Sequence, residues 1–309
     1  MNVIFLCDIF EYYFRIKQKN FPSQSEVEIL NVFQNPKNRF VVSENYVELL
    51  RNNFNNAPDT YEFIEMFFME LFDSSLSDRL VIIPDQNKCT AEDEFIRLST
   101  ILHSEPTLRI AKSSSPKLLA LSNILFVDNP EHFNTSNSIK LHLASRNNHQ
   151  LRYFDFHSKK EVDDFILNFI RIDEEIKSKT IHIFCRDFSI DTCGHFDIIR
   201  SKRYDINFYS RSFKNVERKE QFMTEELQVF NKRLHAYFGS NFTLYLASHV
   251  NLIHERMVII GGLILTLDDD FNNTDPSRFT WSLSIEYSIS SALLLLQKAG
   301  RFREFRLRA

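Results

Sequence analysis

The sequence has 309 residues, of which 25% are charged and 43% are apolar, and its formal net charge is −4. This balance predicts a water-soluble globular protein, and a chain of this length usually folds as about two domains. The negative net charge excludes a protein that binds nucleic acid through an overall positive charge. The four cysteines form no C-x-x-C pair and no zinc-finger spacing, which favours a reduced, cytoplasmic protein.

Two further classes are disfavoured by the placement of apolar residues and glycines. The N-terminal apolar run contains Asp8 and follows no basic residues, and "SALLLLQKAG" is short, so we expect neither a signal peptide nor a transmembrane segment. The first glycine is Gly194, and nucleotide-binding loops need glycine where the backbone approaches phosphate. Residues 1–193 therefore contain no P-loop and no G-x-G-x-x-G turn.

Short strands alternate with helices through the first half of the chain. Predicted strands cover residues 2–10, 39–43, 78–85, 108–112 and 123–128. Predicted helices cover residues 23–35, 44–54, 59–72, 90–102 and 116–122, with Ser23 and Thr90 in N-cap positions. This alternation predicts a parallel α/β domain.

The second half begins after a polar, turn-rich segment, residues 134–150, in which we place a boundary between residues 138 and 139. Helical periodicity marks residues 158–176, 225–238 and 288–297, and strand-like runs mark residues 179–188, 205–213, 242–271 and 278–287. The second half is therefore also α/β, with its strands clustered.

Acidic residues in the first half lie where strands end or helices begin. Asp8 ends the first predicted strand, Glu48 lies on the helix after "VVS", and Asp93 opens a later helix beside Glu92 and Glu94. An acid at the end of an apolar strand is costly unless it is paired or binds a metal. This order of features resembles a PIN-like nuclease domain.

The resemblance implies a metal-dependent nuclease, with RNA as the substrate. Asp8, Glu48 and Asp93 would be the catalytic residues and the ligands of Mg²⁺ or Mn²⁺. Hard cations prefer carboxylate oxygens, and they activate water and stabilise charge on a phosphodiester. The chain departs from the family at the fourth acid, where it has Ser113 to Ser115. The alternative is that these acids are helix caps and surface charge.

The stretch "IHERMVIIGG", residues 253–262, places a histidine and an arginine two positions apart, before two adjacent glycines. On a strand, His254 and Arg256 would point to one face. The pattern resembles the H-x-[KR]-x4-D-G-G motif of the phospholipase D superfamily, with His254 in place of the nucleophile and Arg256 in place of the phosphate-binding cation. Gly261 stands where the motif has its aspartate.

This second resemblance covers about residues 150–300 and is nearest to the phospholipase D-like domain at the C-terminal end of MIT-domain proteins, whose role is binding. It implies that His254, Arg256 and Asn272 bind phosphate. Active members pair two such motifs, whereas this chain has one, so the resemblance implies a phosphate-binding pocket or an assembly surface. A homodimer could supply a second histidine. The alternative is an ordinary hairpin with a Gly-Gly turn.

We therefore predict an α/β protein with a PIN-like parallel sheet flanked by helices in residues 1–138, followed by a phospholipase D-like α/β domain in residues 139–309. The predicted function is a metal-dependent ribonuclease whose C-terminal domain binds phosphate, a protein partner or a second copy, in a prokaryotic defence or toxin system. Two alternatives stay open. One is a non-catalytic binding protein with two degenerate nuclease-like domains, and the other is a dimeric phospholipase D-type nuclease.

Overall fold

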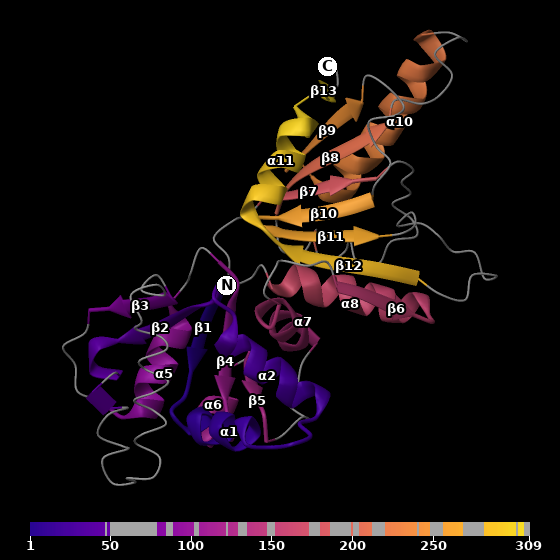
Figure 1. Ribbon diagram of the computed structural model, residues 1–309. Coiled ribbons are helices and arrows are strands. Elements are labelled where there is room, and N and C mark those ends of the chain that lie inside the picture. Colours follow the sequence, from indigo (N-terminus) through magenta and orange to yellow (C-terminus); the bar gives the residue numbers. More distant parts are fainter. Residues whose placement is uncertain are drawn as a thin grey trace. The chain divides into compact units, whose positions relative to one another are not determined.

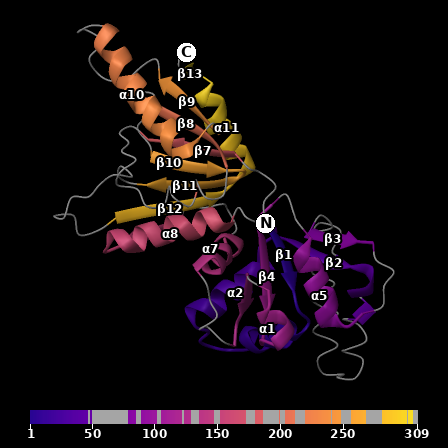
Figure 2. The same cartoon turned by 180° about the vertical axis from the view of Figure 1, so that it is seen from behind.

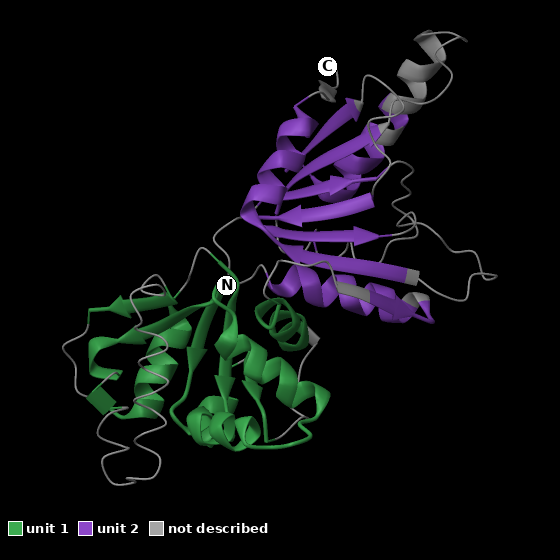
Figure 3. Ribbon diagram, viewed as in Figure 1, with its two compact units in different colours: residues 1–150, 175–177 green, residues 151–174, 178–309 purple. Residues whose placement is uncertain are grey.

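The computed structural model divides the chain into two compact units, and each is α/β, as the sequence predicted (Figures 1 and 3). The first unit comprises residues 1–150 and 175–177, and the second comprises residues 151–174 and 178–309. The structure describes residues 1–46, 48–49, 79–84, 89–101, 105–121, 123–128, 135–146, 152–172, 180–185, 199, 204–211, 220–239, 241–247, 256–267, 281–300 and 302–305.

The first unit is built on a five-stranded sheet in the order β3-β2-β1-β4-β5. All four neighbouring pairs are parallel. The strands are β1 (Asn2–Phe5), β2 (Arg39–Ser43), β3 (Leu80–Ile83), β4 (Thr107–Ala111) and β5 (Ile124–Phe126). Because the strands are parallel, their carboxyl ends lie at one edge, where α/β folds commonly place their sites.

The helices of the first unit begin at the caps that the sequence predicted. Ser23 and Glu26 form a capping box at one helix, and the Thr90 hydroxyl accepts the N–H of Asp93 at another. The helices are α1 (Asp8–Lys17), α2 (Gln24–Gln34), α5 (Ala91–Thr100), α6 (Pro116–Leu119) and α7 (Thr135–Ala144). The sequence-based boundary at 138/139 falls within α7, which packs against α2 and lies in the first unit.

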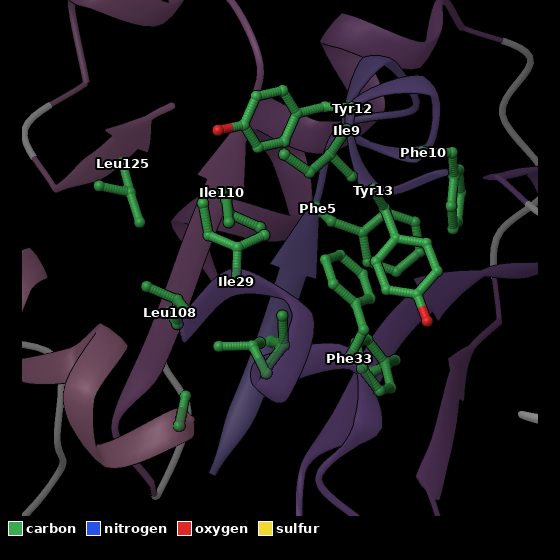
Figure 4. Packing of buried hydrophobic residues seen from close by; sticks show 14 of the residues in the cluster. Phe5, Ile9, Phe10, Tyr12, Tyr13, Ile29, Phe33, Leu108, Ile110 and Leu125 are labelled. Carbon is green, nitrogen blue, oxygen red and sulfur yellow. The ribbon is translucent and has the colours of Figure 1, made fainter. Parts of the chain in front are cut away.

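Both faces of this sheet are buried, as is usual for parallel sheets. On β1, Val3 and Phe5 point into one apolar cluster, whereas Ile4 points into the other. The larger cluster is aromatic (Figure 4): the rings of Phe5 and Phe10 lie 5.0 Å apart, and those of Tyr13 and Phe33 also lie 5.0 Å apart. Edge-to-face and tilted ring pairs of this kind add to the free energy gained by burial alone.

The second unit is built on an eight-stranded sheet in the order β13-β9-β8-β7-β10-β11-β12-β6. The strands β7, β8 and β9 are mutually parallel, and the remaining pairs are antiparallel. The strands are β6 (Arg152–Phe156), β7 (Thr180–Phe184), β8 (Asp205–Arg211), β9 (Phe242–Ala247), β10 (Arg256–Ile260), β11 (Leu263–Leu267), β12 (Trp281–Tyr287) and β13 (Phe302–Phe305).

Helices cover both faces of the second sheet. The helix α11 (Ile289–Ala299) lies over the face seen in Figure 1, where Ala292 packs in a cluster with Phe184 and Tyr209. The helices α8 (Lys159–Ile172) and α10 (Glu220–Phe238) lie on the opposite face (Figure 2), and Phe238 of α10 packs 6.4 Å from the ring of Phe208. No helix in the described part of the chain is both long and apolar enough to cross a membrane.

Candidate functional site

The carboxylate of Asp8 lies at the carboxyl edge of the first sheet. It follows β1, and its two oxygens accept the backbone N–H groups of Lys112 at 3.0 Å and Ser113 at 3.1 Å. These residues follow β4, which pairs with β1. Asp8 therefore fixes the start of the connection between β4 and α6 against the end of the first strand.

The same connection joins Asp8 to a second carboxylate. The Ser113 hydroxyl donates to Asp128 at 3.2 Å, and Asp128 follows β5, the neighbour of β4. Asp128 was not among the predicted site residues, although it has the same signal as Asp8: an acid close after a short apolar run, "ILFVD". Ser113 stands where the PIN-like pattern has an acid, and Asp128 supplies a carboxylate next to it.

The pKa of Asp8 depends on burial, on its hydrogen bonds and on two nearby charges. Burial raises the pKa of Asp8 above its usual value, and the smaller effect of the Asp128 charge adds to this rise. The two backbone hydrogen bonds and the charge of Lys112 oppose it only in part. The Lys112 ammonium group also lies 3.4 Å from Glu11. A bound cation would further stabilise the ionised form of the partly buried Asp8 carboxylate.

Asp93 lies at the start of α5 and is tied to the same connection. Its carboxylate pairs with the Lys117 ammonium group at 3.0 Å and accepts the Thr90 hydroxyl at 2.6 Å. These two hydrogen bonds lower the pKa of Asp93, and the hydrogen bond to Asp93 raises the pKa of Lys117. The neighbouring Glu92 accepts the hydroxyl of Ser115. The first turn of α5 thus holds the far end of the connection that Asp8 holds at its start.

The remaining acids of the predicted constellation have different surroundings. Glu94 is buried and pairs with Arg97 at 2.6 Å. Burial alone would raise the pKa of Glu94, but hydrogen bonds from Arg97, Ser43 and Cys89 together lower it. Glu48 is exposed, and within the described ranges no hydrogen bond or ion pair joins it to Asp8 or Asp93.

These residues can be tested against the needs of a metal ion. Among the described residues, no group of three or more His, Cys, Asp or Glu side chains is arranged as a metal site. Mg²⁺, however, keeps several waters and is usually held by one or two carboxylates together with substrate phosphates. Asp8 and Asp128 are joined through Ser113, so two carboxylates at one edge of the sheet fit a cation of this kind.

The second unit has a comparable edge at the carboxyl ends of β7, β8 and β9. Arg256 begins β10 at this edge, because the next residue, Met257, pairs with Phe184 at the end of β7. The other two predicted phosphate-binding residues, His254 and Asn272, lie outside the described residues. Met257 packs on the α11 side of the sheet, so Arg256 belongs to the side of α8 and α10.

The adjacent glycines form the turn of the hairpin between β10 and β11. Ile260 pairs with Leu263, so Gly261 and Gly262 are the only residues between the strands. Gly261 has φ of +57°, which the first central position of a type II′ turn requires. A Cβ on Gly262 would lie 2.8 Å from Cε2 of Tyr287. The backbone conformation at residue 261 and the close packing at residue 262 therefore explain why both positions are glycine.

Comparisons with known proteins found similarity to solved structures only. No protein-family model and no curated protein match the sequence. Among solved structures, the chain is similar to the phospholipase D family member Nuc of Salmonella typhimurium, at 14% identity over 51% of this chain and 99% of that one, with a TM-score of 0.35. It is also similar to NucT of Helicobacter pylori, at 11% identity over 50% of this chain and 100% of that one, with a TM-score of 0.33.

A third solved structure is the phosphatidylserine synthase of Haemophilus influenzae, at 12% identity over 50% of this chain and 40% of that one, with a TM-score of 0.35. A phospholipase D family member, Nuc, is thus among the structures that the chain resembles.

Proposed function

We propose that the protein is a metal-dependent nuclease whose centre lies at the carboxyl edge of the first sheet. The observation that carries this proposal is Asp8, a partly buried carboxylate that follows β1 and is joined through Ser113 to Asp128. The all-parallel order β3-β2-β1-β4-β5, with an acid after β1, supports a PIN-like assignment of the first unit. The preference for RNA follows from that resemblance.

Asp8 and Asp128 would hold Mg²⁺ or Mn²⁺, with Glu48 and Asp93 completing the set by resemblance. When bound, such a cation lowers the pKa of a water molecule and neutralises charge that develops on a phosphodiester. The chain itself orients the Asp8 carboxylate through the N–H groups of Lys112 and Ser113. For Asp93 to take part, its carboxylate would have to exchange the Lys117 ammonium group for the cation.

The second unit would bind phosphate or a partner through the edge at which Arg256 lies. An arginine at the carboxyl ends of parallel strands is well placed to pair with a phosphate in a planar, bidentate manner. Its partner would be the nucleic acid itself, a second copy of the chain or another protein. A nuclease joined to such a domain would suit a prokaryotic defence or toxin effector.

A nuclease assay with Mn²⁺ on single-stranded RNA and DNA tests the proposal. We expect cleavage that EDTA abolishes and that Asp8→Asn removes, with Asp164→Asn, an exposed aspartate on α8, as the matched control. Activity that resists EDTA would move the chemistry to the second unit, because histidine-based cleavage needs no metal. A protein that binds RNA without cleaving it would overturn the nuclease proposal.

One observation favours a second candidate function, a binding protein without catalytic activity. Asp93 and Glu94 are each paired with a cationic side chain, Lys117 and Arg97, and such pairs neutralise the charge that a metal would need. In that case fluorescence anisotropy would detect RNA binding that neither Mn²⁺ nor EDTA alters. Metal-dependent binding would instead support the nuclease centre.

A further inference from the structure

A serine, a histidine and a glutamate form a hydrogen-bonded chain where α7 packs against α2. The Ser138 hydroxyl is 3.3 Å from Nε2 of His142, one turn further along α7. Nδ1 of the same imidazole is 2.9 Å from Oε1 of Glu28, on α2. This group is separate from the acids at the carboxyl edge of the sheet and has no part in the proposed nuclease.

The solvent exposure of the three residues is lowest at the glutamate and higher at the histidine and the serine. The Glu28 side chain is 7% exposed and the His142 side chain is 15% exposed, whereas Ser138 is half-buried. A carboxylate as buried as Glu28 is stable only with hydrogen-bonding partners, so the hydrogen bond to His142 stabilises it. Ser138, at the other end of this series of hydrogen bonds, is partly exposed.

The hydrogen bonds also favour one tautomer of the His142 imidazole. An ionised Glu28 accepts a hydrogen bond, so Nδ1 of His142 carries a proton and donates it. In the neutral imidazole, Nε2 then has the lone pair and can accept the Ser138 hydroxyl proton. A distance of 3.3 Å between nucleophile and base is slightly long, as is common in sites without a bound substrate.

We propose that Ser138, His142 and Glu28 form a nucleophile, a general base and an orienting acid that hydrolyse small activated carboxylic esters. Two side chains on one helix and one on a neighbouring helix supply the three roles that define such a site. Ser138 is the fourth residue of α7, so it also lies near the positive end of the helix dipole, which favours developing negative charge.

The reaction is balanced without a cofactor. Ser138 Oγ attacks the ester carbonyl carbon while its proton passes to Nε2 of His142. The bond from carbon to the leaving oxygen then breaks, and that oxygen takes the proton, which leaves an acyl-serine ester. Water attacks this ester and gives its proton to Nε2, after which Ser138 is released with that proton restored. The net change is ester and water to acid and alcohol.

A fluorophosphonate probe and the substrate p-nitrophenyl acetate test this site on the full chain. We expect mass spectrometry to locate the probe on Ser138 and not on Ser25, an exposed serine of α2 whose hydroxyl contacts only Ser23 in the described structure. Ser138→Ala should remove labelling, and His142→Gln should slow it by at least about 10²-fold, the usual contribution of a general base. Ser25→Ala should leave labelling and ester hydrolysis unchanged.

Loss of folding is separated from loss of reactivity by melting each variant. The proposal is overturned if Ser138 is labelled no faster than Ser25 in the wild-type chain. It is also overturned if a folded His142→Gln variant is labelled as fast as the wild type. The nuclease proposal is independent, because Asp8→Asn should abolish nuclease activity and leave the labelling of Ser138 intact.

Discussion

The two units place their candidate sites at the same kind of edge but fill them with opposite charge. In the first unit, the carboxyl ends of parallel strands carry Asp8 and Asp128, which are joined by one serine. In the second unit, the corresponding edge carries Arg256. Strand order thus determines where a site can lie in an α/β sheet, whereas the side chains at the edge determine its chemistry.

This difference has a consequence for phosphate. At the edge of the first unit, the carboxylates of Asp8 and Asp128 would bind a phosphodiester only with a cation between them, because like charges repel. At the edge of the second unit, the proposed phosphate-binding residue Arg256 would pair with phosphate directly. The first site should therefore depend on a divalent metal, and the second should respond to salt.

The largest expected effect comes from comparing substitutions of Asp8 and His254. We predict that Asp8→Ala lowers Mn²⁺-dependent nuclease activity by about 10³-fold or more, because it removes the carboxylate that would hold the cation. His254→Ala should change that activity less than about 2-fold, because the motif has glycine, not aspartate, at residue 261 and so lacks the acid that orients the histidine. Both variants are compared in one initial-rate assay.

Asp8→Ala also leaves the N–H groups of Lys112 and Ser113 without their acceptor, so it should destabilise the first unit by about 1–3 kcal/mol. A denaturant titration separates this loss from the loss of activity. If His254→Ala removes activity and Asp8→Ala spares it, the comparison between the two edges is reversed, and the phospholipase D-type chemistry takes its place.

The sequence predicted the parts of the first site that depend on local pattern. The cap at Thr90 and the capping box at Ser23 each depend on residues close in sequence, so cap chemistry reveals them. The predicted strand over residues 2–10 is too long, because β1 ends at Phe5 and Asp8 begins α1. The link from Ser113 to Asp128 depends on β5 lying beside β4, and strand order cannot be read from propensity.

Partners that are distant in sequence could not be predicted for the same reason. Lys117 neutralises Asp93 only because the connection after β4 returns to α5, and Glu28 meets His142 across 114 positions of the chain. Ser138 and His142 are four residues apart on α7, a spacing that suggests a contact. Nothing in the sequence indicates that a buried glutamate lies behind the histidine.

The next effect concerns the hairpin at the opposite end of β10 from Arg256. Gly262→Ala should destabilise the second unit by about 1–3 kcal/mol, because the new Cβ would lie 2.8 Å from Cε2 of Tyr287 and 3.3 Å from the backbone nitrogen of Ile289. Gly261→Ala should cost about 1 kcal/mol, the usual penalty of a positive φ. Thermal unfolding of both variants measures the difference. Equal losses would show that Tyr287 moves aside freely.

A smaller effect is expected from the cation of the second edge. Arg256→Gln should weaken RNA binding and reduce the slope of log affinity against log salt by about one unit, as for one lost phosphate contact. Asp8→Asn should leave that slope unchanged when binding is measured without metal. Anisotropy titrations at several salt concentrations provide the measurement. An unchanged slope in Arg256→Gln would show that this arginine does not contact a phosphate of the RNA.

The smallest effect separates the pH responses of the two units. In the second unit, the hydroxyl of Tyr209 on β8 lies 3.1 Å from Nδ1 of His182 on β7. Burial lowers the pKa of His182 to about 4 and raises the pKa of Tyr209 to about 12, with a further contribution from Tyr245. His182 is therefore neutral in the folded protein at pH 5, whereas the unfolded chain takes up a proton below about pH 6.5.

The sign follows from this difference in proton uptake. The contribution of His182 to stability is complete above about pH 6.5 and is lost as the pH falls toward 4, because only the unfolded state binds the proton. Asp8 acts in the opposite direction. Its raised pKa means that its folded form gains relative stability as acid protonates it. Acid should therefore weaken the second unit through His182 while Asp8 favours the first.

His182→Gln isolates the histidine, because the amide oxygen can still accept the Tyr209 hydroxyl but does not titrate. We predict that the wild type loses about 1 kcal/mol more stability than this variant between pH 7 and pH 5, with allowance made for the partial exposure of the ring. Calorimetric melting of both proteins at the two pH values measures this loss. A variant that loses as much stability as the wild type would show that His182 is protonated in the folded state, and the contrast between the units would then rest on Asp8 alone.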